Sequence, residues 1–354
     1  AAKHNIQCYN SVNSCLGVPN YGDPILSLRY IIFSISKTTL PGSDMTSSKK
    51  INFTPILIIF FSVIILSKSV KALDVEPGLW AHIPVERHFI GMGYVKTEAD
   101  ILFDPTLKLE DVEMDMDTWV AKYIYSFESF GKSSRIDITQ GYQEGHWKGL
   151  LDGAYAETTR NGPSDSFIRY AISLYGAPPL KSGDYVAYRR KQDGETIVGA
   201  GLAVRLPTGD YDKDLLINLG QNRFAFRPQL GIEHNRGPWT FEATSEVAFY
   251  TSNNEFYNGN RLEQDPTLTL GASAEYTYRP GLRGTIGFAY DYGGETSVND
   301  ARNDDRKQNV GWSASISYPL GPTSGVKFAW VKTETQESTG LDSESFVFAI
   351  VTSF

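Results

Sequence analysis

Hydrophobic and polar residues alternate with a period of two along most of the chain after residue 89. Between residues 267 and 279 the even-numbered positions are apolar and the odd-numbered positions are mostly polar or charged. Residues 310–318 repeat this pattern, and in residues 239–249 the odd-numbered positions are the apolar ones. Because successive side chains of a β-strand point to opposite faces, each segment predicts a strand with one apolar and one polar face.

Thirteen segments of this kind predict an all-β fold. They begin near Phe89, Trp119, Arg135, Leu150, Ser166, Thr196, Arg223, Trp239, Thr267, Leu282, Val310, Val326 and Ser345. The segment at Leu150 is the weakest, because Asp152 breaks its alternation. Residues 181–191 contain Tyr185, Tyr188 and a basic cluster, and they are compatible with a short helix instead.

These strands fit either a soluble antiparallel sandwich or a transmembrane barrel. Most of them exceed the roughly 5 or 6 residues of a typical soluble strand and match the roughly 9 to 11 of a tilted membrane strand. Several apolar faces carry an aromatic residue towards a strand end, namely Trp239, Tyr278, Tyr292 and Tyr318. Aromatic residues at that position are typical of the two girdles that a membrane barrel places at the lipid–water interfaces.

The connections alternate between short and long, which favours the barrel. Short turns are expected at residues 234–238, 279–282 and 319–325, and long polar loops at 207–222, 253–266, 293–309 and 333–343. Bacterial outer-membrane barrels have short periplasmic turns, long extracellular loops and an even number of strands. We therefore predict an antiparallel transmembrane β-barrel of the bacterial outer membrane with about 12 strands, within a range of about 12 to 14.

The N-terminal part of the chain has the pattern of a secretory signal peptide. The first methionine is Met45, and it precedes Lys49, Lys50, an apolar run over residues 56–66 and a possible cleavage point after Ala72. A membrane anchor is the alternative, but such a run covers about 16 Å of a bilayer core that is about 30 Å thick. We expect an upstream extension over residues 1–44, the signal peptide over 45–72, a periplasmic segment over 73–88 and the barrel over 89–354.

The chain ends on an amphipathic strand with Phe348, Ile350 and Phe354 on one face. A terminal phenylalanine in this setting resembles the element by which bacterial outer-membrane proteins are recognised by their assembly machinery. We therefore expect that machinery and outer-membrane lipid to be partners.

Composition and charge exclude several other classes of protein. Acidic residues exceed basic ones by 41 to 33, which gives a net charge of −8 and no basic surface for a nucleic acid. The mean hydropathy of −0.27 excludes a bundle of membrane helices, which needs several long apolar runs.

No set of residues suggests catalysis or metal binding. The histidines after residue 73 are His82, His88, His146 and His234, and none has the spacing of a metal site. Two of these precede the barrel and two lie in predicted turns, so no strand centre offers a histidine for a catalytic triad. The two cysteines lie in the upstream extension. We expect no enzyme activity, no cofactor and no metal.

The polar strand faces carry charges of both signs. They are Arg169, Arg205, Arg227, Glu233, Glu242, Glu246, Glu275, Arg279, Arg283, Asp291 and Lys327. One interpretation is a charged constriction that selects solutes in the lumen. The other is a set of ion pairs that fills a narrow lumen and holds the wall together, because a barrel of about 8 strands is packed whereas about 16 to 18 leave a channel.

A series of short motifs runs through the second half of the chain. They are residues 207–212, 216–220, 222–223, 228, 230–231, 237–239, 242, 264–266 and 290–294, with 175–178 and 198–199 upstream. In this order they resemble the MetA-pathway of phenol degradation family of outer-membrane proteins. Most of these are turn and loop residues rich in proline, glycine, aspartate and asparagine. The resemblance implies a β-barrel that passes small, often aromatic or hydrophobic, compounds across the outer membrane.

Two functions follow as hypotheses. The first is a channel or facilitator for small solutes, aromatic or hydrophobic ones included. The second is a structural or surface-interaction barrel whose lumen is closed by the segment before residue 88 or by an inward-folded loop. In both, the apolar faces contact lipid through Phe241, Val247, Leu270, Ala274, Phe288, Ile316, Phe328 and Phe348.

Overall fold

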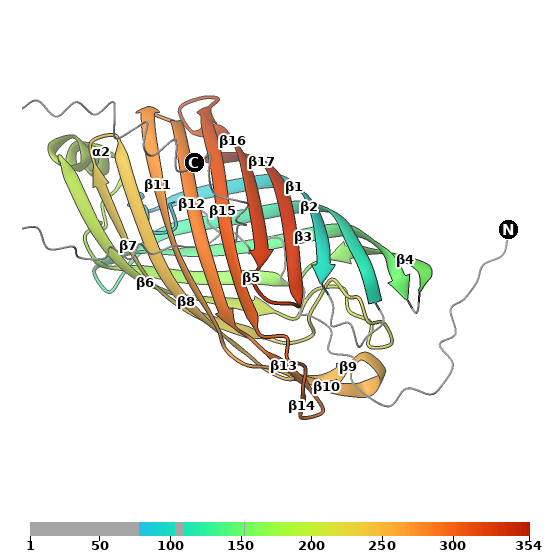
Figure 1. The fold of residues 1–354 in the computed structure, drawn as a ribbon. Coiled ribbons are helices and arrows are strands. Elements are labelled where there is room, and N and C mark those ends of the chain that lie inside the picture. The colour runs from blue at the N-terminus through green and yellow to red at the C-terminus, as the bar shows by residue number, and fades with distance from the viewer. Residues whose placement is uncertain (1–77, 103–108, 152) are drawn as a thin grey trace, which may run out of the picture.

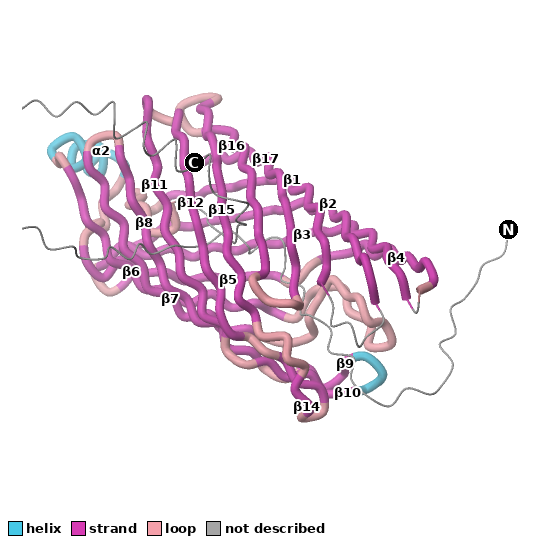
Figure 2. The backbone as a smooth tube through the Cα atoms, viewed as in Figure 1, coloured by secondary structure: helices cyan, strands magenta, loops and turns pink. Residues whose placement is uncertain are grey.

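The computed structural model describes residues 78–102, 109–151 and 153–354, and these form a closed antiparallel β-barrel (Figures 1 and 2). Both the upstream extension and the expected signal peptide lie outside the described residues. The first half of the wall consists of β1 (Arg87–Leu102), β2 (Leu109–Ser129), β3 (Lys132–Leu151), β4 (Ala154–Pro163), β5 (Ser166–Tyr175), β6 (Gly194–Leu206) and β7 (Ala225–Arg236). The second half consists of β8 (Trp239–Tyr250), β11 (Thr267–Arg279), β12 (Leu282–Gly293), β15 (Lys307–Pro319), β16 (Ser324–Thr335) and β17 (Gly340–Ser353).

The thirteen wall strands occupy twelve positions, because β4 and β5 share one. The second half of β3, from Tyr142 onwards, pairs with β4, and Tyr142 lies opposite Pro163. The first half of β3, up to Thr139, pairs with β5, and Thr139 lies opposite Phe167. Ser164 and Asp165 interrupt this shared position. The weakest of the thirteen predicted segments, the one at Leu150, therefore corresponds to β4, which is half of a barrel strand. The prediction of a twelve-stranded barrel is confirmed.

The barrel closes between its first and last strands. β1 pairs with β17 from Phe89 opposite Ser353 to Leu102 opposite Gly340, and its other edge pairs with β2. Each remaining neighbour around the ring is also antiparallel, including β2 with β3. A closed ring leaves no open sheet edge in lipid. Among the described strands, β4, which extends the shared position towards the long-loop end, pairs only with β3.

The two ends of the barrel differ, as the alternation of turns and loops predicted. One end carries the short turns and α2 (Ser182–Lys191), so the segment 181–191, which the sequence pattern left open, contains a helix. The other end carries the long loops and a small separate sheet (Figure 1). The sheet consists of β9 (Asn253–Phe256), β10 (Asn260–Gln264), β13 (Thr296–Val298) and β14 (Ala301–Arg302), with the short 3-10 helix η2 (Tyr257–Gly259) between its first two strands. The sequence pattern did not predict this sheet, because strands of two to five residues show no clear alternation.

Some boundaries differ from the prediction. β2 begins at Leu109 and not near Trp119, β1 begins at Arg87 and not at Phe89, and β17 begins at Gly340 and not near Ser345. β2 and β3 contain 21 and 20 residues, about twice the length that a tilted strand needs to cross a bilayer. Their outer faces are charged towards the long-loop end, so the apolar period that marks the membrane span covers only part of each strand.

The outward face of the barrel is apolar, and the inward face is largely polar. Phe241, Ile316 and Phe328 are about half exposed, as expected for side chains that contact lipid in place of water. All the residues of the predicted lipid-facing belt lie on this outward face. Among the described residues, no helix has the length and apolar character to cross a membrane, and no cluster of side chains has the composition of a metal site.

Candidate functional site

The lumen contains a polar network that crosses from β3 to β8. Arg169 on β5 donates from Nε to Gln229 Oε1 (2.7 Å) and from Nη1 to Asp137 Oδ2 (3.1 Å). Gln229 on β7 in turn donates to Glu246 on β8 (2.5 Å), which also accepts from Arg227 (3.3 Å). All five side chains are largely or fully removed from solvent. Opposite charges are therefore paired across neighbouring strands, as a buried charge requires.

Small residues on β6 make room for this network. Gly199, Gly201 and Ala203 are three consecutive inward-facing residues of β6, which lies between β5 and β7. A Cβ atom at Gly201 would lie 3.2 Å from Gln229 Oε1. The long side chains of β5 and β7 can thus meet across β6 because β6 contributes almost no volume there.

The N-terminal segment (residues 78–86) lies inside the lumen, against the walls formed by β2 to β8. Trp80 donates from its backbone N–H to Glu242 (3.2 Å) and from Nε1 to Thr244 Oγ1 (2.5 Å). The indole ring lies 4.8 Å from the guanidinium carbon of Arg169, which is a cation–π distance. The segment leaves the lumen where the backbone N–H of Glu86 donates to the carbonyl of Ser126 (2.8 Å).

A second anchor holds this segment to α2 and β6. His82 Nδ1 lies 3.1 Å from Glu195 Oε2, and its Nε2 lies 2.9 Å from the carbonyl oxygen of Pro178. Glu195 also accepts from Tyr188 and Arg189 of α2, each at 2.9 Å. Burial, reinforced by the hydrogen bond to Glu195, raises the pKa of Tyr188, so this phenol remains a donor. The helix thus holds the N-terminal segment in place through Glu195, which binds both His82 and the helix.

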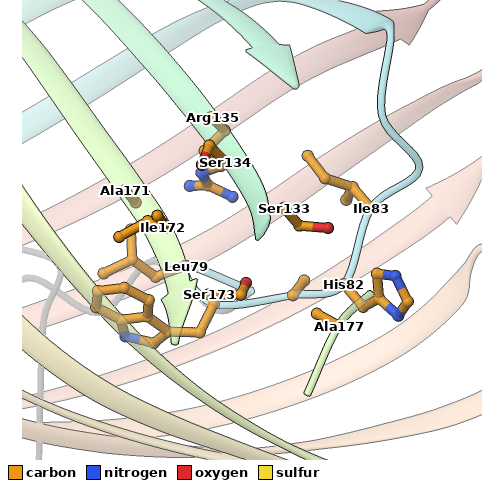
Figure 3. A pocket seen from close by; sticks show the side chains of 12 residues that line it. Leu79, His82, Ile83, Ser133, Ser134, Arg135, Ala171, Ile172, Ser173 and Ala177 are labelled. Atoms are coloured by element: carbon orange, nitrogen blue, oxygen red, sulfur yellow. The ribbon is translucent and has the colours of Figure 1, made fainter. Parts of the chain in front are cut away.

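A small cleft separates the N-terminal segment from the ends of β3 and β5 that lie at the short-turn end of the barrel (Figure 3). Leu79, His82 and Ile83 line one side of it, and Ser133 and Ile172 line the other. The cleft is the space that remains at the short-turn end of the lumen beside the segment.

The long loop between β6 and β7 folds back onto the lumen through a buried carboxylate. Asp165 Oδ1 accepts from the backbone N–H of Gly209 (2.9 Å), and Oδ2 accepts from that of Gln221 (3.0 Å). Oδ2 also lies 3.6 Å from Arg205 Nε, and both side chains are almost fully buried. A Cβ at Gly209 would lie 2.7 Å from the Cα of Gly220, so the two sides of the loop touch through their glycines. The Asp165 carboxylate therefore binds both ends of the loop and holds them together.

The second half of this loop packs on an apolar cluster inside the barrel at the long-loop end. The cluster comprises Ala99 and Ile101 of β1, Val112, Met114 and Met116 of β2, Trp147 of β3, and Leu219 of the loop. Ile217 and Leu341 pack against it. The inner wall is therefore apolar on β1–β3 near the long-loop end and charged on β5–β8 further inside.

The other charged residues that the sequence singled out occupy several places. Glu233 is buried and accepts from Asn235 (2.7 Å), while Asp291 accepts from Thr269 (2.6 Å). Arg283 reaches Glu275 (3.2 Å) at the short-turn end. Lys327 faces inward and is partly buried. Arg279 is exposed beside a turn, with its guanidinium 5.9 Å from the ring of Tyr318, so it lies at the rim of the barrel.

At the C-terminus, Phe354 is 59 % exposed and lies at the seam of the barrel. Its backbone exchanges two hydrogen bonds of 3.0 Å with His88, and its ring stacks on the His88 ring at 5.3 Å. Phe348 and Ile350 face outward on the same strand.

Sequence reasoning missed four residues that organise the lumen. They are Trp80, Asp137, Asp165 and Gln229. The alternation places Asp137 and Gln229 on the inward faces of their strands, so the sequence pattern could have predicted both as lumen residues. Asp165 lies in a break between strands, and Trp80 precedes the barrel, so neither has a strand register that places it.

The fold and the lining together define a β-barrel of the bacterial outer-membrane class, located in that membrane. The chain belongs to the family described as "Putative MetA-pathway of phenol degradation", whose model matches residues 104–349. The family resemblance that the loop motifs carried is thereby confirmed.

Solved structures of other outer-membrane barrels resemble this one. A COG4313 outer membrane channel from Pseudomonas putida F1 superimposes with a TM-score of 0.66 and 18% sequence identity, over 79% of this chain and 100% of that one. The transport unit of the autotransporter AIDA-I from Escherichia coli has a TM-score of 0.44 and 12% identity, over 75% of this chain and 90% of that one. No curated protein matches the sequence.

Proposed function

We propose that this protein is an outer-membrane channel for small solutes, aromatic or hydrophobic ones included, and not an enzyme. The observation that carries the proposal is the division of the inner wall. An apolar surface with two methionines and a tryptophan lies near the long-loop end, and paired charges lie further inside. Methionine and aromatic side chains adapt to apolar ligands of varied shape, and paired charges keep a passage wet without presenting one strong sign of charge.

Family and fold support the same proposal. The family description refers to phenol degradation, and the structure that superimposes at a TM-score of 0.66 is described as an outer membrane channel. A barrel of twelve positions is wide enough for a lumen between the packed interior of small barrels and the open channel of large ones. We further propose that the charged residues of the polar network set the selectivity of this passage.

The second candidate function is a structural or surface-interaction barrel with a closed lumen. It is favoured by two observations, since the N-terminal segment lies within the lumen and the β6–β7 loop packs on its inner wall. Both elements are held by side-chain packing and a few hydrogen bonds, however, and neither is part of the barrel wall. A channel that these elements open and close accounts for them equally well.

Conductance in planar bilayers separates the two functions. The full chain is compared with a variant that lacks residues 78–84, and both are first shown to be folded by their heat-dependent mobility in gels. Discrete current steps that are larger or more frequent in the variant support a channel restrained by the segment. Folded barrels that conduct no current in either form would overturn the proposal and leave the closed barrel.

A further inference from the structure

The seat of Trp80 in the lumen is shaped for a flat ring. Its floor consists of Gly199 on β6 and Gly231 on β7, which are neighbours in the barrel wall. A Cβ atom at Gly199 would lie 2.2 Å from the six-membered ring of Trp80, and one at Gly231 would lie 1.9 Å from its Nε1. Any other residue at either position would expel the indole. Glycine at two facing positions leaves a flat recess against the backbone of the wall.

The seat also has a polar edge and a cationic face. Thr244 on β8 accepts a hydrogen bond from the indole Nε1 (2.5 Å), and the guanidinium of Arg169 lies 4.8 Å from the ring. Arg169 is fixed in place by Gln229 and Asp137, and Thr244 is buried in the wall. Apart from the Trp80 ring itself, the recess is thus built from residues that the barrel holds rigidly.

We propose that this recess is a binding site for a planar aromatic solute with one hydrogen-bond donor, such as a phenol, and that the Trp80 side chain fills it when no solute is bound. The inference rests on the proposed function, because it names a site on the path of that channel. Gly199 and Gly231 provide the floor for the ring, Arg169 the cation–π contact, and Thr244 the acceptor for the hydroxyl. A solute competes with Trp80 for the recess and thereby displaces residues 78–81 from it.

The attachment of the segment suits such a displacement. Trp80 makes its two hydrogen bonds to the wall at Glu242 and Thr244, whereas the anchor at His82 and Glu195 lies two residues further on. Gly78 has a φ of +86°, and its carbonyl accepts from the N–H of Ala81 (3.3 Å), so residues 78–81 form a tight turn. This turn can leave the recess while the His82 anchor stays in place.

The first test measures whether the vacated recess binds the ligand. The probe is 4-fluorophenol, whose fluorine resonance is followed by NMR while the Trp80→Ala barrel is added. Saturable binding is expected, because a cavity left by an aromatic side chain accepts a small aromatic molecule. Trp330→Ala is the matched control, since the Trp330 indole also donates to a side chain, Glu344, but lies on the outer face of the barrel. Equal binding by this control would overturn the proposal.

Two further variants localise the binding. Trp80→Ala combined with Gly231→Leu fills the floor and is expected to abolish binding. Trp80→Ala combined with Thr244→Val removes the acceptor and is expected to weaken 4-fluorophenol roughly two- to tenfold while leaving 4-fluorotoluene unchanged. Binding that survives the first combination, or a loss of both probes with the second, would place the ligand elsewhere and overturn the proposal.

The second test asks whether the solute competes with Trp80 in the otherwise intact chain. Ala81→Cys is introduced with Cys8 and Cys15 replaced by serine, and the rate of thiol labelling is measured with rising 4-fluorophenol. Faster labelling with saturation is expected, and an unchanged rate would overturn the competition. Conductance is recorded separately. A labelling response in a barrel that conducts no current would overturn the channel but not the binding site. Current without a labelling response would overturn the competition with Trp80 but not the channel.

Discussion

At the scale of single residues, Asp165 joins two parts of the chain that are distant in sequence. Its carboxylate accepts from both ends of the β6–β7 loop and faces the buried guanidinium of Arg205. An asparagine at this position retains one acceptor but directs N–H groups towards a donor. We expect Asp165→Asn to destabilise the closed loop by about 1–3 kcal/mol, the usual cost of a buried donor that loses its acceptor. Proteolysis within residues 207–222 measures this opening.

Asp214→Asn is the control for this prediction, because Asp214 lies in the same loop with its side chain 72 % exposed. It is expected to leave the rate of proteolysis unchanged, since surface pairs contribute little. Equal proteolysis of wild type and Asp165→Asn would show that the loop is held by its apolar residues, Ile217 and Leu219, instead.

Arg227 is the residue of the polar network at which a change of charge is easiest to interpret. It donates to Glu246, and Glu246 keeps a second donor in Gln229. Arg227→Ala therefore removes a positive charge from the lumen while Glu246 keeps a hydrogen-bond donor. We expect the free energy of unfolding to fall by about 1–3 kcal/mol. We expect a shift of the reversal potential in a salt gradient towards cation selectivity.

Arg261→Ala is the matched control, because Arg261 pairs with Glu263 on the small outer sheet, away from the wall. It removes the same charge and is expected to leave selectivity unchanged. A shift of equal size in both variants would mean that the surface and not the lumen determines selectivity, and no shift with lowered heat resistance would assign Arg227 a structural role.

At the scale of the element, each strand has one face for lipid and one for the lumen. Leu270 faces outward on β11, and Ser315 faces inward on β15. Leu270→Arg is expected to destabilise the barrel by about 2–4 kcal/mol if the residue lies near the bilayer midplane. Ser315→Arg is expected to cost less, because the lumen is polar. Urea unfolding in lipid vesicles measures both, and equal costs would contradict the assignment of faces.

Element by element, the sequence predicted what depends on local periodicity. The alternation located the barrel strands, and Asp152, which breaks the pattern, marked the weakest of the predicted segments, the one that corresponds to β4. The same local rules do not predict the small sheet, since β13 and β14 contain only three and two residues. Those strands exist because two long loops meet, which is a property of the assembled barrel.

The candidate site was predictable only in part, for the same reason. Alternation placed Arg169 and Glu246 on inward faces, but it does not show that Gln229 links them across the small residues of β6. The glycines at 199 and 231 look in sequence like ordinary breaks in a strand. They acquire a meaning only when Trp80, which is more than a hundred residues away, lies on them.

At the scale of the whole molecule, the wall and the elements inside it are distinct structures. The wall is held by continuous strand pairing around twelve positions, whereas the N-terminal segment and the β6–β7 loop are held by side-chain contacts and a few single backbone hydrogen bonds. Movement of either inner element therefore leaves the hydrogen bonds of the wall intact. This separation allows a stable membrane barrel to change the state of its lumen.

The last strand contributes both to closure of the barrel and, as we propose, to its assembly, and these roles predict different effects. Phe354 pairs with His88 through its backbone, which Phe354→Ala preserves, so the folded barrel should lose only about 0.5–1.5 kcal/mol for the ring contact. If the terminal ring is the assembly signal, the amount of barrel in the outer membrane should fall far more than this small loss explains. Phe346→Ala is the control, since Phe346 lies on β17, the strand that precedes Phe354, and is equally exposed at 59 %. Matching membrane levels for the two variants, measured beside their heat resistance, would assign Phe354 to closure alone.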